Sequence, residues 1–170
     1  MRRRLPLLIV ILLLYAGPGR ATPHAEYRQW LQAAYTDHKA AAHFYDRMQQ
    51  LDEQSPPLLL GFKAMALLLR CRHVPGPFTK LSLFNKGTRL LELAIGREPG
   101  NAELRYFRYS TQCKAPGWLN YGQYLDVDKQ FLLAYLRESR QDPYLVQCVK
   151  SVLLDSGYCS EQEKTMIKSL

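Results

Sequence analysis

Polar side chains recur on one predicted helix at a spacing that suits a binding surface. Arg105, Arg108 and Gln112 follow one another at i, i+3 and i+7, so they share one stripe, and Tyr109 lies beside it. A guanidinium group can hold a carboxylate or phosphate through two parallel hydrogen bonds. We therefore predict that this stripe binds a partner or ligand. The alternative is that the arginines are solvated or pair with Glu103 and other nearby acids.

A second polar group follows the Pro-Gly-Pro turn at 75–77. Lys80 and Asn85 lie just after this turn, and we include both among the candidate binding residues. The turn would then present a rigid recognition edge. The alternative is that the turn only locks together the two helices on either side of it.

The residue patterns of common catalytic and metal sites are absent from the sequence. There is no G-x-S-x-G elbow and no glycine-rich phosphate loop. His38 and His43 are five residues apart, which turns them away from each other on a helix. Asp126 and Asp128 also diverge, and we expect them to favour the positive end of their helix. We predict no metal, no cofactor and no enzymatic activity.

The N-terminus has the pattern of a secretory signal peptide over residues 1–21. Arg2, Arg3 and Arg4 precede an apolar stretch at 5–16, and small residues flank a cleavage position near Ala21. The apolar stretch is shorter than the roughly 20 residues of a membrane-spanning helix, although a retained anchor is the alternative. Cleavage would place residues 22–170 outside the cytoplasm as a single domain.

Removal of the signal peptide changes the charge of the chain. The net charge of +8 includes four arginines of the signal peptide, so 19 basic and 15 acidic residues remain. The mature surface is therefore only mildly basic. Nucleic-acid binding needs a concentrated basic face, and we expect none here.

Apolar residues recur every three or four positions along the rest of the chain, and strand signals are nearly absent. This spacing predicts an all-α fold. The segment Leu58–Cys71 is apolar almost all round, so we expect it to be the central buried helix. The predicted helices are 23–52 (two helices, or one bent helix), 58–71, 79–96, 102–113, 125–139, 143–155 and a short one after Ser160.

One segment resembles a tetratricopeptide repeat. Gly87, Leu91, Ala94 and Pro99 match the spacing of the second helix and closing turn of that family, in which small residues let paired helices approach. The later half of the chain follows the pattern loosely, with an insertion at 114–121. The resemblance implies seven to eight antiparallel helices stacked as degenerate pairs in a short right-handed α-solenoid. It also implies that the Arg105 stripe faces a concave groove.

Residues 73–87 together with 101–112 also resemble small exported helical proteins of bacteria whose function is uncharacterised. This resemblance covers about residues 25–140. It implies a fold and a location outside the cytoplasm, and it carries no catalytic residues over to this chain.

Four cysteines remain after the signal peptide, and no C-x-x-C pair occurs, so a zinc or thioredoxin-type redox site is not supported. In a repeat stack, Cys71 and Cys113 would end neighbouring parallel helices and could form a disulfide. Cys148 and Cys159 would then be left to pair. The alternative is that all four are free buried thiols.

Taken together, these patterns predict a non-catalytic binding module of the cell envelope, periplasmic or secreted. It would hold a protein or peptide as an adaptor or assembly factor, without nucleic-acid binding or a stable membrane span. One alternative is an enzyme of another kind, with perturbed pKa values in a cleft. The other is a small-ligand carrier whose pocket is lined by aromatic residues: Tyr27, Trp30, Tyr106, Tyr109, Trp118, Tyr121 and Tyr124.

Overall fold

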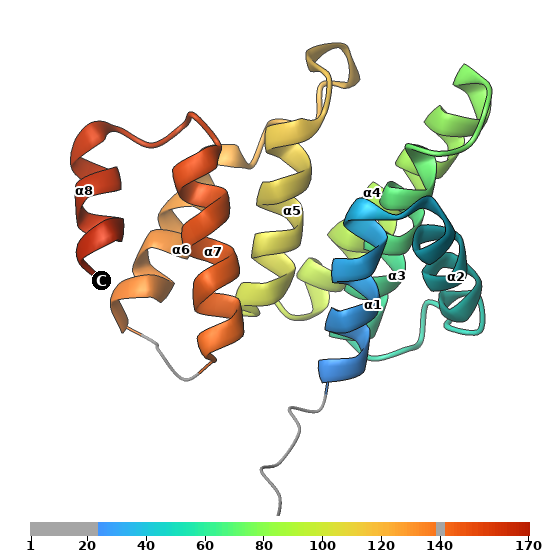
Figure 1. The fold of residues 1–170 in the computed structure, drawn as a ribbon, viewed down its shortest axis with the longest axis horizontal. Helices are drawn as coiled ribbons and strands as arrows, with labels where there is room; N and C mark the ends of the chain where they lie inside the picture. The colour runs from blue at the N-terminus through green and yellow to red at the C-terminus, as the bar shows by residue number, and fades with distance from the viewer. Residues whose placement is uncertain (1–23, 139–141) are drawn as a thin grey trace, which may run out of the picture.

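The computed structural model describes residues 24–138 and 142–170, and this part of the chain contains helices and no strand (Figure 1). The all-α prediction of seven to eight helices is confirmed. The predicted signal peptide lies outside the described residues. The α-helices are α1 (Ala25–Thr36), α2 (His38–Met48), α3 (Pro57–Cys71), α4 (Pro77–Arg97), α5 (Ala102–Lys114), α6 (Leu125–Glu138), α7 (Pro143–Asp155) and α8 (Glu161–Ser169); the 3-10 helix η1 (Gly117–Leu119) follows α5.

Capping side chains set several helix boundaries. The Asp37 carboxylate accepts hydrogen bonds from the backbone N–H groups of Lys39 and Ala40, so α1 and α2 are two helices and not one bent helix. The Asn101 side chain caps α5 in the same way. Ser160 starts α8 with a capping box, and the sequence predicted a short helix after this residue.

The apolar residues form two clusters that share α5. The first cluster holds the buried side chains of α1 to α4, and α3 is apolar and largely buried, as predicted. The second cluster holds those of α6, α7 and α8. Helix α5 lies between the two groups (Figure 1). It contributes Leu104 and Phe107 to the first cluster and Tyr109 to the second, so this helix joins the two halves of the molecule.

Two glycines let α3 approach its neighbours closely. A Cβ atom at Gly87 of α4 would lie 2.8 Å from Leu68 Cγ and 3.1 Å from the Ala64 carbonyl oxygen. A Cβ atom at Gly61 of α3 would overlap the Leu104 side chain of α5. The small residue predicted at Gly87 therefore has the packing role that its position in the sequence suggested.

The turn between α3 and α4 and the loop that follows α5 both project from the same edge of the molecule (Figure 1). Among residues 24–138 and 142–170, no helix has both the length and the apolar character that a membrane crossing requires.

Candidate functional site

The polar stripe predicted on α5 meets a single buried carboxylate. Arg108 donates from Nε to Asp128 Oδ2 at 2.7 Å and from Nη2 to Oδ1 at 2.8 Å. Arg105 Nη1 donates to the same carboxylate at 2.9 Å, and Gln112 Nε2 donates at 3.0 Å. The structure thus brings the three residues together, but on Asp128 of α6 and away from solvent.

Arg108 is out of reach of an outside ligand. It is 3% exposed, its third nitrogen Nη1 donates to Glu92 Oε2 at 2.6 Å, and its guanidinium carbon lies 4.1 Å from the centre of the Tyr124 ring. Burial alone would lower the pKa of Arg108, but the hydrogen bonds and charges of Asp128 and Glu92 raise it overall. The guanidinium therefore stays charged and bound inside the protein.

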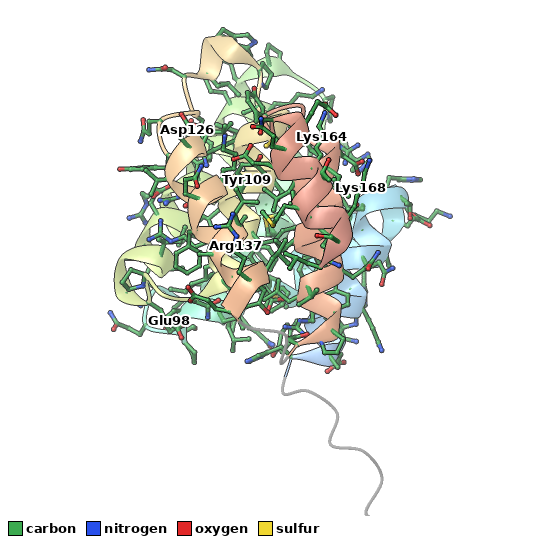
Figure 2. All side chains as sticks on the ribbon, turned by 90° about the vertical axis from the view of Figure 1, so that its left-hand side faces the viewer. Glu98, Tyr109, Asp126, Arg137, Lys164 and Lys168 are labelled. Carbon is green, nitrogen blue, oxygen red and sulfur yellow. The ribbon has the colours of Figure 1, made fainter. Side chains whose placement is uncertain are left out.

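This geometry does not present the predicted stripe to an open groove. Tyr109 is fully buried among the helices (Figure 2), and its hydroxyl lies 2.9 Å from Ser156 Oγ. Pairing with nearby acids, the alternative that the sequence left open, describes Arg105 and Arg108. Their partners are Asp128 and Glu92, since Glu103 has another cation.

Glu103 belongs to a second buried ion pair that the sequence did not reveal. Arg28 of α1 donates to both Glu103 oxygens, at 2.8 and 2.7 Å, and to Asp142 Oδ2 at 2.6 Å. Burial would lower the pKa of Arg28, but these two carboxylates raise it overall. The cluster ties α1 to α5 and to the residue that caps α7.

The sequence held one signal for the buried acid. Asp126 and Asp128 do point apart as predicted: the Asp126 side chain is 89% exposed (Figure 2), whereas Asp128 is fully buried. Asp128, Leu132 and Leu136 are spaced four residues apart and share the inward face of α6. An acid on an apolar stripe needs a buried cation, and this rule could have identified Asp128.

An apolar groove opens between the α3–α4 turn and the end of α5. Its volume is about 570 Å³, within the usual range for ligand-binding clefts. Its apolar lining includes Leu68 and Leu69 of α3, Leu81 and Phe84 of α4, and Trp118 and Leu119 of η1. Leu81 and Phe84 continue the apolar stripe of α4, but Leu81 is exposed and Phe84 is only half-buried, with its ring against that of Tyr121.

Large apolar side chains remain in water at this groove. Trp118, which lines it, is 76% exposed, and Phe78, next to the lining residue Pro77, is 87% exposed. Leu81 is also exposed. Clustered exposed side chains of this size are typical of binding surfaces, in which tryptophan and other aromatic anchors are enriched.

The charged residues that line the groove are all basic: Arg72, Lys80 and Lys114. The Lys114 ammonium lies 5.2 Å from the centre of the Tyr35 ring, and burial raises the pKa of Tyr35. Lys80 is thus the one predicted binding residue that lines the groove. Asn85 is exposed outside it.

The four cysteines are thiols in this structure, and none is joined in a disulfide. Cys71 lines the groove and donates from Sγ to the Lys80 carbonyl oxygen at 3.2 Å, whereas Cys113 packs against the second cluster. The predicted Cys71–Cys113 bridge is absent because the two side chains face different parts of the molecule. Burial raises the pKa of all four thiols, Cys148 and Cys159 included, which disfavours the nucleophilic thiolate.

Most of the aromatic residues predicted to line a small-ligand pocket lie outside the groove. Of those seven residues, only Trp118 lines the groove. Tyr27 and Trp30 pack against the first cluster, and the Tyr121 hydroxyl donates to Glu92 at 2.7 Å. The described residues contain no group of histidine, cysteine and acidic side chains placed to hold a metal ion.

Comparison with known proteins finds no matching family model, no matching curated protein and no matching solved structure. Function is therefore inferred from the groove itself. Its lining combines apolar and aromatic surface with cations, a composition suited to holding a ligand.

Proposed function

We propose that this chain is a non-catalytic, exported helical-repeat module that holds an apolar segment of a protein or peptide in the groove between α4 and the end of α5. One observation carries the proposal: an open apolar groove is bordered by the exposed side chains of Phe78 and Trp118. A folded chain normally keeps such a group of side chains out of water unless a partner covers it.

Covering these residues would contribute favourably to the binding free energy. Burying most of one aromatic side chain removes roughly 150 Å² or more from water and contributes about 1.5–3 kcal/mol to the stability of a complex. Part of this contribution is cancelled by the translational and rotational entropy that the two partners lose on binding.

Sequence features support a role as an adaptor or assembly factor in the cell envelope. Residues 1–21 have the pattern of a secretory signal, which would take the mature chain to the periplasm or outside the cell. The spacing of Gly87, Leu91, Ala94 and Pro99 resembles that of helical repeats, a family that commonly presents binding surfaces for proteins.

Photo-crosslinking in the source cells tests this proposal. A photoreactive phenylalanine analogue placed at Trp118 in the full chain should form a discrete protein adduct. The matched control carries the analogue at Tyr158, which is also exposed but follows α7. We expect the adduct at position 118 alone and its loss when Leu81→Asp is added. Equal adducts at both positions, or none at position 118, would overturn the proposal.

A small-ligand carrier is the second candidate, and the groove volume of about 570 Å³ favours it, because this space suits a compact apolar molecule. Native mass spectrometry of the gently purified protein would then show an added mass of a few hundred daltons. Leu81→Asp should abolish that mass. Such a ligand, present in stoichiometric amount, would replace a protein segment as the natural occupant.

A further inference from the structure

We propose that the partner segment is acidic as well as apolar, and that its carboxylates meet Arg72, Lys80 and Lys114. This inference rests on the proposed function, because it names the chemistry of the segment that would occupy the same groove. The observation behind it is the one-sided charge of the groove lining.

Three cations reach the groove from three different elements. Arg72 follows α3, Lys80 lies in the first turn of α4, and Lys114 ends α5. No aspartate or glutamate lines the groove with them. All three side chains are exposed, and within residues 24–138 and 142–170 none of them forms an ion pair with a carboxylate.

This arrangement differs from that of the arginines at the helix interfaces. Arg28, Arg105 and Arg108 each contact at least one carboxylate, and the exposed Arg89 pairs with Glu53. The protein thus supplies counter-charges to the cations near its helix interfaces and supplies none at the groove. An anionic partner would supply the negative charges that the chain itself does not place at the groove.

The apolar walls make this complementarity selective. Charges interact more strongly beside apolar surface than in bulk water, because less solvent screens them. A docked segment with carboxylates is therefore attracted to the three cations, while a segment with lysine or arginine at the same places is repelled. Charge would decide which apolar segments bind.

A protein segment suits this surface better than a compact anionic molecule. Phe78 lies outside the groove lining, on the exposed first turn of α4, and most of the Trp118 surface faces water. A molecule confined to the groove would leave Phe78 uncovered. A longer chain can fill the groove and also cover that side chain, as peptides do when they dock in a helical groove.

Peptide selection tests the inference. The protein, purified as its cells produce it, is used to select from a phage-displayed library of random twelve-residue peptides, with a parallel selection on Leu81→Asp. We expect the peptides that require Leu81 to combine aromatic or aliphatic residues with aspartate or glutamate and to be net negative. Groove-dependent peptides that are neutral or basic would overturn the acidic chemistry and leave the proposed function standing.

Charge-reversal variants give the quantitative test. We expect Lys80→Glu with Lys114→Glu to weaken binding of the best selected peptide at least tenfold, and added salt to weaken wild-type binding as well. The matched control reverses Arg137 and Lys168, which are exposed on α6 and α8 (Figure 2). The control should change the affinity less than twofold. Equal effects of the two double variants would overturn the inference.

Trp118 itself can report binding. The chain has two tryptophans, so Trp30→Phe leaves Trp118 as the sole fluorophore of this type, and a docked peptide should shift its emission to the blue. Decanoate and vesicles of phosphatidylcholine with one quarter phosphatidylglycerol are titrated in parallel. If either gives the charge-dependent shift while no groove-dependent peptide is selected, the peptide partner is overturned. If no probe shifts the emission and no peptide is selected, the proposed function fails too.

Discussion

At the scale of single residues, the most consequential side chain is a carboxylate in the interior. Asp128 is fully buried, and Arg105, Arg108 and Gln112 all donate to it. A buried charge is tolerated only when its partners replace the hydrogen bonds of water. These contacts therefore fix the register between α5 and α6.

Asp128→Asn should destabilise the protein strongly. The amide would remove the negative charge and turn N–H donors toward Arg105 and Arg108, which are donors themselves. We expect a loss of about 3–5 kcal/mol in the free energy of unfolding, measured by urea denaturation. The control on the same helix is Asp126→Asn, whose exposed side chain lies 3.7 Å from Lys129 and should cost less than about 0.5 kcal/mol. Similar losses for the two variants would contradict this assignment.

Asp142 should make the free energy of unfolding depend on pH in the acidic range. Partial burial would raise the pKa of Asp142, but hydrogen bonds from Arg28 and from the Leu145 N–H lower it below its ordinary value of 3.8. The unfolded chain therefore binds this proton more tightly, so the stabilisation is present above about pH 4 and is lost as the pH falls through the folded-state pKa.

Urea midpoints at pH 5 and pH 3 measure this effect. The wild type should lose more stability over that interval than Asp142→Asn, in which the replacement still caps α7. A variant with the same pH dependence as the wild type would show that Asp142 contributes nothing to it.

At this scale, the sequence predicted on which side of a helix a side chain lies, but not which residue it pairs with. The spacing of Asp126 and Asp128 correctly placed them on different sides of α6. It could not show that Asp128 meets Arg108, because the pair is 20 residues apart and forms only when α5 packs against α6. The same limit applies to Arg28 and Glu103, which are 75 residues apart.

At the scale of helices, local signals were enough to predict most boundaries. Asn101, Asp142 and Ser160 cap helices whose observed starts agree with the predicted ones at 102, 143 and just after Ser160. Helix α4 begins at Pro77, two residues before the predicted start at 79, because proline is tolerated in the first turn of a helix. These signals act within a few residues of the chain, so tertiary packing is not needed to recognise them.

Two glycines of α4 allow a matched test of helix packing. Gly87→Ala places a Cβ atom 2.8 Å from Leu68 Cγ and 3.1 Å from the Ala64 carbonyl oxygen, so α3 and α4 must move apart. We expect a loss of about 1–3 kcal/mol in stability. Gly96→Ala meets nothing within 4 Å and should stabilise by up to about 1 kcal/mol through helix propensity. Equal effects in thermal denaturation would contradict close packing at Gly87.

The groove shows what a helical pattern leaves undecided. Leu81 and Phe84 continue the apolar stripe of Leu91 and Ile95, and the sequence placed all of them on one face. Leu91 and Ile95 are buried, whereas Leu81 is exposed at the groove. Periodicity identifies an apolar face but not the element that covers it.

At the scale of the whole molecule, the main feature is the dependence of both clusters on α5. Leu104 and Phe107 belong to one cluster and Tyr109 to the other. The Arg28–Glu103 ion pair adds a polar connection between α1 and the same helix. We therefore expect the two halves to fold and unfold together.

Arg28→Met tests this cooperativity. It leaves Glu103 buried without its cation and should cost about 3–5 kcal/mol in the free energy of unfolding. In a Trp118→Phe background, Trp30 emission reports the first cluster and far-ultraviolet circular dichroism reports all helices. The two urea midpoints should fall together in Arg28→Met. A shift of the Trp30 signal alone would show that the halves unfold separately.

The groove is lined in part by α5, the helix that both clusters share, through Thr111 and Lys114. Any molecule that binds there only when the chain is folded raises the free energy of unfolding, and it does so for both halves because they are expected to unfold in one transition. At 100 times its dissociation constant, such a molecule would add about 2.7 kcal/mol. A melting curve of the intact protein therefore works as a screen for compounds and peptides, and it requires neither a label nor an identified natural partner.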